Sequence, residues 1–309
     1  MIRHLLSISD LTARDIEGLL ALTARCKGNG ASFGRALAGK AVALIFEKSS
    51  TRTRLACEVA VGRLGGRPVT IAGTDLQVGR GETLEDTARI FSRFVDAVCW
   101  RTTGHDRLEA FAKVATIPVI NTLSDAEHPC QILADLFTIR ERFGRGRWPS
   151  VAFVGDAGNN VAHSWLLAAG TLGMDLRLAY PSRHQPDLAV RTAAAKLAKA
   201  SGAKLTFTND PAEAAKGADV LYTDVWVSMG QEAERGERLK LFRPYQIGAK
   251  LMKLASVRAV VMHCLPAHRG EELTAEVMDS EKSIVFDQAE NRLYNAMAAL
   301  LWCTGGGKS

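Results

Sequence analysis

Short apolar segments alternate along the chain with longer stretches that have helical spacing of their apolar residues. The apolar segments have the length of buried strands. Strands that alternate with helices pair in parallel, so we predict an α/β fold with open, mostly parallel sheets and helices on both faces, and not a sandwich or a bundle. The predicted strands are Ala41–Phe46, Pro68–Ile71, Ala97–Trp100, Pro118–Asn121, Val151–Val154, Leu176–Tyr180, Lys204–Thr208, Val220–Thr223, Arg258–Met262 and Ser283–Phe286.

The length of 309 residues predicts two domains. The segment "HPCQILADLFTIRERFG" has the pattern of a long helix, and the polar turn "GRGRWPS" follows it. We therefore place a first domain at 1–135 and a second at 136–287. A C-terminal helix at about 288–309 is expected to pack back on the first domain, so that interdomain helices link the two.

Composition excludes several classes of protein. The chain is 47% hydrophobic and 23% charged, an ordinary balance for a globular protein. Its net charge of +6 comes from scattered Lys and Arg with only 6% aromatic residues, which does not fit a nucleic-acid groove but suits small anionic substrates. Neither a membrane span nor a targeting segment is recognised, so a cytoplasmic protein is expected. The six cysteines form no C-x-x-C pair, and neither a zinc site nor a disulfide framework is indicated.

Hydroxyl and guanidinium groups are concentrated where the first predicted strand ends and a helix begins. Backbone N–H groups at a helix N-terminus lack partners and attract anions, and arginine side chains match the oxygens of a phosphate. The cluster therefore predicts a site for a dianion, although a capping turn with solvated arginines is an alternative. A Walker loop is excluded because its glycine spacing is absent. The cluster comprises Ser49, Ser50, Thr51, Arg52, Thr53 and Arg54.

Other polar residues follow later strands of the first half. Arg101 comes directly after the third predicted strand, and His128 and Gln131 stand at i and i+3, so both can face one point from the start of a helix. Alternatively, His128 neighbours a helix cap and Gln131 is a surface residue. In the second half, "GDAGNNVAHS" lacks the glycine spacing of a dinucleotide site. Asn159 and Asn160 in it are either amides for a polar substrate or ordinary turn asparagines.

Two further segments follow buried strands of the second half. "TDVWVSMGQE" places Asp224 where it can bind an ammonium group, the alternative being a salt-bridged acid beside a buried Trp226. "VVMHCLPAHRGEE" contains Cys264 without a nucleophile elbow or a triad spacing. A buried, inert thiol is the usual case for such a cysteine.

Together the segments "FEKSSTRTR", "HPCQ", "DVWVSMGQE" and "HCLPAHRGEE" resemble the aspartate/ornithine carbamoyltransferase family, in order and separation, over essentially the full chain. The ornithine branch is the more similar one. The resemblance implies an enzyme that transfers the carbamoyl group of carbamoyl phosphate to the δ-amine of L-ornithine, giving L-citrulline and phosphate. It also implies a homotrimer with shared active sites and a reaction that needs no metal or cofactor.

The same resemblance assigns site residues. Arg101, His128 and Cys264 are expected to be catalytic, with Cys264 as a polar positioning group and not a covalent nucleophile. Gln77 is expected to reach the site of a neighbouring subunit. The residues implied for carbamoyl phosphate are Ser50, Thr51, Arg52, Thr53, Gln77, Arg101, His128, Gln131, Cys264, Leu265 and Arg292, and those implied for ornithine are Asn160, Asp224, Ser228 and Met229.

The acceptor follows partly from charge. Aspartate as acceptor would need an arginine or lysine partner, whereas this loop offers Asp224, which suits a cationic amino acid. Relatives that use N-acetylornithine or putrescine are disfavoured by the S-M-G sequence, on resemblance alone. Cys130 stands between two expected ligand residues with no assigned effect. A non-catalytic anion-binding module is the rival interpretation, and an anabolic role in arginine synthesis is not distinguished from a catabolic one.

Overall fold

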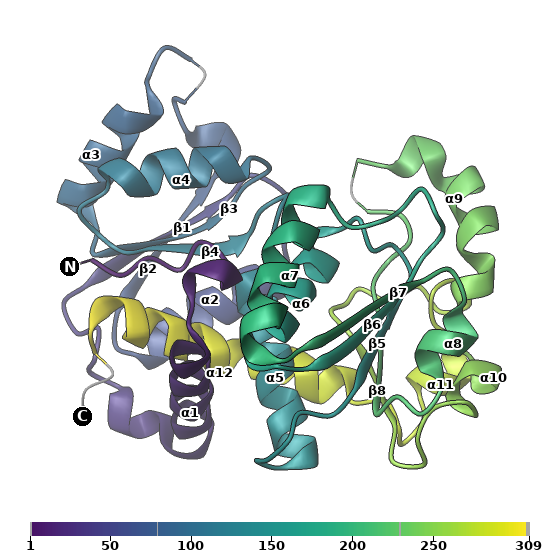
Figure 1. Cartoon of the computed structure of the whole chain (residues 1–309). Coiled ribbons are helices and arrows are strands. Elements are labelled where there is room, and N and C mark those ends of the chain that lie inside the picture. The colour runs from purple at the N-terminus through teal and green to yellow at the C-terminus, as the bar shows by residue number, and fades with distance from the viewer. Residues whose placement is uncertain (1, 79, 229, 307–309) are drawn as a thin grey trace. The chain divides into compact units, whose positions relative to one another are not determined.

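The computed structural model describes residues 2–78, 80–228 and 230–306, which form two compact units (Figure 1). The first unit contains the chain up to Phe137 and again from Glu290, and the second contains Thr138–Ala289. Helices α5 (Pro129–Phe143) and α12 (Val285–Thr304) each run through a unit boundary. Each unit has a sheet of parallel strands with helices, which confirms the predicted fold class.

The first unit holds a four-stranded parallel sheet in the order β2-β1-β3-β4. Its strands are β1 (Ala41–Phe46), β2 (Arg67–Ala72), β3 (Ala97–Arg101) and β4 (Val119–Leu123), and its other helices are α1 (Ala13–Asn29), α2 (Arg52–Arg63), α3 (Leu84–Phe94) and α4 (His105–Val114).

Alternating side chains of the first sheet enter two different layers. Ala43, Ile45 and Trp100 pack in one cluster with residues of α3 and α4, where Trp100 meets Phe111 edge-to-face at 5.2 Å. On the opposite face, residues of β3 and β4 meet α2 and α12. Period-2 alternation within each strand thus fills a core on both faces of the sheet.

The second unit holds a five-stranded parallel sheet in the order β7-β6-β5-β8-β9. Its strands are β5 (Val151–Val154), β6 (Asp175–Ala179), β7 (Lys204–Thr208), β8 (Val220–Thr223) and β9 (Val260–His263), and its helices include α6 (Asn160–Leu172), α7 (Leu188–Ser201), α8 (Pro211–Ala215), α9 (Arg235–Phe242), α10 (Ala249–Met252) and α11 (Ala275–Met278).

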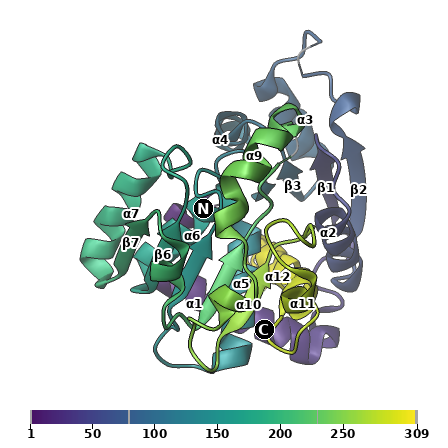
Figure 2. The ribbon, with the colours of Figure 1, turned by 90° about the vertical axis from the view of Figure 1, so that its right-hand side faces the viewer.

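Both faces of the second sheet are also covered. On one face Trp165 of α6 meets Tyr222 of β8 at 5.4 Å, and Figure 2 shows α6 and α7 beside β6 and β7. On the other face Val154 and Leu221 pack in one cluster with Phe242 of α9. The layers are helix, sheet, helix, as expected when parallel strands are joined by helical crossovers.

One predicted strand is wrong. Ser283–Phe286 was expected to be a strand, but Ser283 forms only an isolated bridge with Val261, and α12 begins at Val285. The other nine predicted strands are present, with ends that differ by two residues at most.

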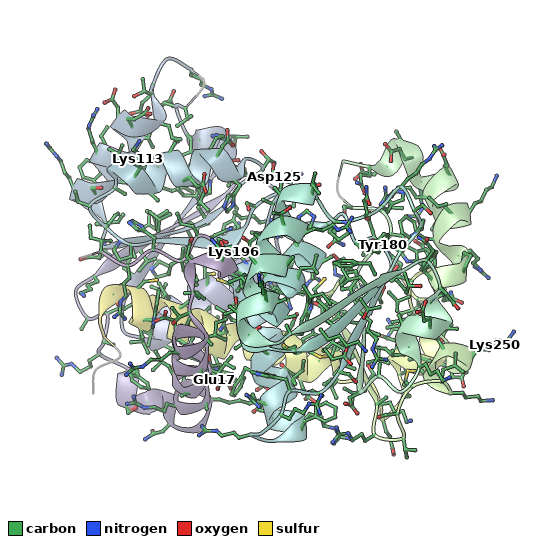
Figure 3. The ribbon with its side chains drawn as sticks, viewed as in Figure 1. Glu17, Lys113, Asp125, Tyr180, Lys196 and Lys250 are labelled. Atoms are coloured by element: carbon green, nitrogen blue, oxygen red, sulfur yellow. The ribbon has the colours of Figure 1, made fainter. Side chains whose placement is uncertain are left out.

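Charged side chains are spread over exposed positions of both units (Figure 3). None of the helices in the described part of the chain is long and apolar enough to span a membrane. Exposed charged residues labelled in Figure 3 are Glu17, Lys113, Asp125, Lys196 and Lys250.

Candidate active site

Strand order locates a candidate site in each unit. In the first unit the chain passes from β1 to β2 on one side and then to β3 on the other side of β1. In the second unit, β6 and β7 lie on one side of β5, and β8 lies on the other. Ligands of open α/β sheets bind beyond the carboxyl ends of strands at such reversals. These points are the carboxyl ends of β1 and β3 and of β5 and β8. The hydroxyl cluster, Arg101, Asn160 and Asp224 stand there, whereas His128 and Gln131 follow β4, and Cys264 and Leu265 follow β9.

Helix α2 begins at the hydroxyl cluster, as the sequence predicts. Thr51 is the N-cap residue, but its side chain makes no capping hydrogen bond. The capping alternative is therefore wrong for Thr51, which is exposed, while Ser50 and Arg52 are half-buried. Arg54 instead forms an exposed ion pair with Glu58 one turn later, at 3.0 Å. Arg52 and Arg54 thus differ in surroundings although they are two residues apart.

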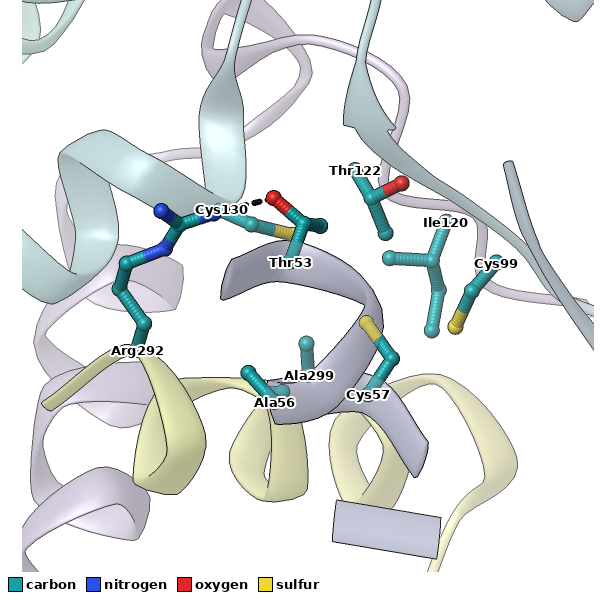
Figure 4. A pocket seen from close by; sticks show the side chains of 10 residues that line it. Thr53, Ala56, Cys57, Cys99, Ile120, Thr122, Cys130, Arg292 and Ala299 are labelled. Carbon is teal, nitrogen blue, oxygen red and sulfur yellow. Dashed lines mark hydrogen bonds between the residues drawn. The ribbon is translucent and has the colours of Figure 1, made fainter. Parts of the chain in front are cut away.

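Thr53 is buried in the first turn of α2 and accepts a hydrogen bond from the Arg292 guanidinium of α12 (Figure 4). Both side chains line a cavity of about 20 Å³, room for about one water molecule. The cavity is also lined by the thiols of Cys57, Cys99 and Cys130. The Arg292–Thr53 bond ties the last helix to the N-terminus of α2.

Cys130 belongs to the packing behind this turn. Its thiol donates to the Asn121 carbonyl at 3.3 Å, and burial raises the pKa of Cys130 to about 12. A thiol with such a pKa stays protonated at neutral pH and is unreactive. Its position in the segment "HPCQ" therefore has a packing explanation.

His128 is buried and lies close to two cations. Burial lowers the pKa of His128 well below its ordinary value, and the charges of Arg292 and Arg101 lower it further. The imidazole is therefore neutral at neutral pH and can donate one hydrogen bond to a carbonyl oxygen. The structure thus brings together His128, Arg101 and Arg292, three residues that the sequence separates by up to 191 positions.

Gln131 and Gln77 have different surroundings. Gln131 is buried on α5, and its Nε2 donates to Asp135 at 2.8 Å. Its Oε1 is buried and has no hydrogen-bond partner among the described residues, which leaves an acceptor for a ligand N–H. Gln77 is exposed in the segment between a short 3-10 helix (Gly73–Asp75) and α3.

In the second unit, Asp224 and Cys264 form a buried pair. The Cys264 thiol donates to Asp224 Oδ1 at 2.9 Å, and Asn159 Nδ2 donates to Oδ2 at 3.2 Å. Burial raises the pKa of Asp224, and the neighbouring His263 and the thiol only partly oppose this. The thiol acts here as a proton donor, in keeping with a positioning role.

The asparagines after β5 have separate roles. Asn159 is the N-cap of α6, and its Oδ1 accepts from the Ala162 N–H at 2.8 Å. Its side-chain amide therefore hydrogen-bonds within the turn and to Asp224. This agrees with the second of the two alternatives for Asn159, an ordinary turn asparagine. Asn160 is the first residue of α6. Ser228 is half-buried and its N–H donates to the Gln231 side chain at 3.0 Å, whereas Met229 lies outside the described residues.

Leu265 has φ of 61°, a left-handed conformation that is rare for a leucine. Its N–H donates to His263 Nδ1 at 2.8 Å, so Nε2 carries the proton and faces Glu272 Oε1 at 3.1 Å.

His263, Asp224 and Cys264 also have the residue types of a metal site, with ligand atoms within 4.8 Å of one another. We read them as a hydrogen-bonded network because both nitrogens of His263 are already used.

Sequence reasoning missed the buried ion pair of Asp156 and Arg238. Arg238 of α9 contacts Asp156, which follows β5, and its Nε donates to the Trp226 carbonyl at 2.6 Å. Although burial opposes ionisation, the hydrogen bond from His184 and the charge of Arg238 hold the pKa of Asp156 below its ordinary value. The pair supports the loop after Asp224. The position of Asp156 directly after a strand could have marked it in the sequence as a candidate site residue. Nothing in the sequence around Arg238 indicates that its side chain is buried.

The fold and these two sites define a two-domain, all-parallel α/β protein with one polar site at the switch point of each sheet. Residues 3–141 match the carbamoyl-P binding domain of aspartate/ornithine carbamoyltransferase, and residues 149–303 match the Asp/Orn binding domain. The chain therefore belongs to the aspartate/ornithine carbamoyltransferase family.

Individual relatives are similar over nearly the whole chain. The ornithine carbamoyltransferase of Methanothermobacter thermautotrophicus is 50% identical over 303 residues, which cover 98% of this chain and 99% of the relative. The structure of ornithine carbamoyltransferase from Pyrococcus furiosus has a TM-score of 0.94 at 49% identity, covering 98% of this chain and 97% of that one. The anabolic ornithine carbamoyltransferase of Campylobacter jejuni has a TM-score of 0.93 at 39% identity, covering 98% and 99%.

Proposed function

We propose that the chain transfers the carbamoyl group of carbamoyl phosphate to the δ-amine of L-ornithine, giving L-citrulline and phosphate. The observation that carries the proposal is the grouping of Arg101, Arg292 and a neutral His128 in the unit in which α2 begins at the hydroxyl cluster. Two fixed cations and a helix N-terminus suit a dianion, and a neutral imidazole suits a carbonyl oxygen. Membership of the family and the similarity to relatives named ornithine carbamoyltransferase support the same reaction.

The phosphate of the donor is assigned to the α2 turn. Ser50, Thr51, Arg52 and Thr53 supply hydroxyls, backbone N–H groups and one guanidinium there. Arg292 holds the Thr53 hydroxyl in place through their hydrogen bond. The first unit is accordingly assigned as the carbamoyl-phosphate-binding domain.

Transfer requires positioning and charge stabilisation more than reactive side chains. The ornithine nitrogen attacks the carbonyl carbon, the bond from that carbon to the phosphate oxygen breaks, and the departing phosphate takes a proton from the amine. Arg101 and His128 stabilise the charge that develops on the carbonyl oxygen, which is the largest contribution expected in such a site. Gln131 Oε1 accepts from the carbamoyl amide, since it is buried without another partner.

The acceptor is assigned to the second unit. Asp224 and Cys264, 2.9 Å apart, orient the δ-amine, which must be neutral to attack. Asn160, Ser228 and Met229 are assigned to the amino-acid end of ornithine, and the Leu265 carbonyl to the carbamoyl amide. An acidic partner favours ornithine over aspartate, whose second carboxylate would be repelled.

A citrulline assay with carbamoyl phosphate and four acceptors tests the proposal. We expect product with ornithine, and rates lower by at least about 100-fold with N-acetylornithine, putrescine and aspartate, because each lacks or adds a charged group. Absence of citrulline with intact phosphate binding would favour the non-catalytic module instead. Trapping of a carbamoyl group on Cys264 would contradict its positioning role.

The assembly belongs to the same proposal. We infer a cytoplasmic homotrimer in which Gln77 of one subunit completes the site of its neighbour. Exposure of Gln77 supports this, because a polar side chain that contributes to another subunit must lie on the surface of its own.

A further inference from the structure

Three side chains of the turn after Cys264 converge on one point. His268 Nδ1 lies 3.8 Å from Glu272 Oε2 and 4.0 Å from Glu271 Oε2, and all three atoms lie within 4.8 Å of one another. The three atoms are buried, and none of them has a hydrogen-bond partner among the described residues. None is used by the proposed carbamoyl transfer.

Each carboxylate has one oxygen engaged by the protein and the other turned toward the imidazole. Glu272 is fully buried, and its Oε1 receives His263 Nε2 at 3.1 Å and the His268 N–H at 2.5 Å. Glu271 Oε1 forms an ion pair with Arg235 of α9. A buried carboxylate oxygen without a hydrogen bond is unfavourable, so Glu272 Oε2 points to a ligand that neutralises it.

We propose that His268, Glu271 and Glu272 bind a divalent transition-metal ion of the Zn²⁺ or Co²⁺ type. One imidazole nitrogen and two carboxylate oxygens are a common ligand set for such ions, with bonds of about 2.0–2.2 Å and a remaining position for water. Tetrahedral binding requires ligand atoms about 3.4 Å apart, so the two separations between His268 and the carboxylates, 3.8 and 4.0 Å, need to shorten by about half an ångström. The half-exposed His268 gives the ion a route from solvent.

The ion would act on the turn that carries Cys264 and Leu265. Glu272 links the proposed ion to His263, and His263 Nδ1 holds the N–H of Leu265. Binding would therefore stiffen this turn without contact with substrate, through the hydrogen bonds of a metal ligand to its neighbours. This consequence rests on the proposed function, whereas metal binding itself does not.

The full-length protein, stripped of metal with a chelator, is titrated with Co²⁺ at neutral pH and followed by its absorption spectrum. We expect one Co²⁺ per chain, with weak visible bands typical of nitrogen and oxygen ligands. His268→Gln and Glu271→Gln should each weaken binding by at least about 100-fold, since loss of an outer-shell partner alone weakens metal sites by about 10–100-fold.

Two matched controls separate ligand loss from other effects. Arg235→Gln breaks the ion pair to Glu271 and keeps every ligand, so Co²⁺ affinity should stay the same or rise. Glu276→Gln removes a carboxylate from an exposed position of α11 and should leave affinity unchanged. Thermal unfolding of the metal-free variants checks that each is folded.

Two results would overturn the proposal. A strong near-ultraviolet thiolate-to-cobalt band would place the ion at Asp224, His263 and Cys264 instead. Unchanged affinity in both ligand variants would mean that the Co²⁺ binds elsewhere and that these three side chains hold no ion. A lack of citrulline formation in the separate assay would contradict the proposed function and leave the Co²⁺ result intact.

Discussion

At the scale of single residues, Arg52 and Arg54 offer a matched comparison. Both are arginines in the first turn of α2, but Arg54 is exposed and paired with Glu58, whereas Arg52 is half-buried at the phosphate turn. We expect Arg52→Gln to lower kcat/KM for carbamoyl phosphate by about 100-fold or more, the effect of removing one donor to a developing charge. Arg54→Gln should stay within about twofold, as exposed ion pairs contribute little. Steady-state kinetics measure both, and equal losses would contradict the assignment.

His128 gives a prediction about pH. Because burial and two arginines lower the pKa of His128 in the native protein, the unfolded chain takes up this proton at a higher pH. The native state then binds fewer protons below about pH 6.5, so the free energy of unfolding falls as the pH drops. The loss from His128 at pH 5.5 has an upper limit of about 1.4 kcal/mol relative to neutral pH, which the unfolded pKa of about 6.5 sets.

Urea unfolding of the protein and of His128→Asn at pH 7.5 and 5.5 measures this effect. The variant is expected to lose less stability between the two values, whatever its stability at pH 7.5. An identical pH dependence in both proteins would mean that another group is responsible.

Single residues also show what the sequence can and cannot predict. The hydroxyl turn at the start of α2 was predictable because the strand end, the Ser and Thr residues and the helical pattern are contiguous in the sequence. The pair Asp156–Arg238 was not, because its partners are 82 residues apart and nothing local to Arg238 distinguishes it from an exposed arginine of α9. Buried charge pairs depend on tertiary contacts that periodicity does not report.

At the scale of elements, the same pair joins the loop after β5 to α9. Both side chains are nearly fully buried, so Asp156→Asn leaves the buried Arg238 with only the exposed Glu234, 3.7 Å away, as an ionic partner. We expect a loss of about 3–5 kcal/mol in the free energy of unfolding of the second unit. The Michaelis constant for ornithine should also rise, because Arg238 holds the Trp226 carbonyl in the loop after Asp224, which the proposed function assigns to ornithine.

A control is the exposed pair of Arg269 and Asp279, at 2.7 Å. Asp279→Asn makes the same chemical change on the surface of the same unit and should have little effect. Guanidinium unfolding followed by the fluorescence of the buried tryptophans compares the two variants. Equal, small losses would show that the Asp156 pair does not support the loop.

The length of the apolar segment explains why Ser283–Phe286 was wrongly predicted to be a strand. Ile284, Val285 and Phe286 form a short apolar run, and three residues do not distinguish a strand from the first turn of a buried helix. In the structure, only Ser283 and Ile284 reach β9, and the helix starts at Val285. The other strands were predictable because each is bounded by turn residues and followed by a long helix. The order of the strands within each sheet was not predictable from the sequence. It depends on the side of the first strand on which each following strand is placed.

At the scale of the whole molecule, the two switch points give the sites a common origin. In each sheet the chain reverses its direction of winding beside the first strand. Arg52, Arg101, Asn160 and Asp224 stand at the strands that flank these reversals, whereas other expected ligand residues come from β4, β9 and α12. The proposed function thus assigns the carbamoyl donor and the acceptor to two units of the same architecture. The family resemblance added what this architecture leaves undetermined, which is the identity of the substrates and the contribution of Gln77.

The trimer with shared sites is tested by mixing two inactive variants. Arg101→Ala removes a residue from a subunit's own site, and Gln77→Ala removes one that is expected to serve the neighbouring site. Each variant alone should be nearly inactive and have a mass near 100 kDa in solution, three times the 33.4 kDa of one chain. After unfolding and refolding of an equimolar mixture, random assembly places one intact site in every mixed trimer, which restores about one quarter of the wild-type activity.

Refolded Gln77→Ala alone is the control. If Gln77 served its own subunit, mixing would restore nothing, and a monomeric mass would exclude sharing altogether.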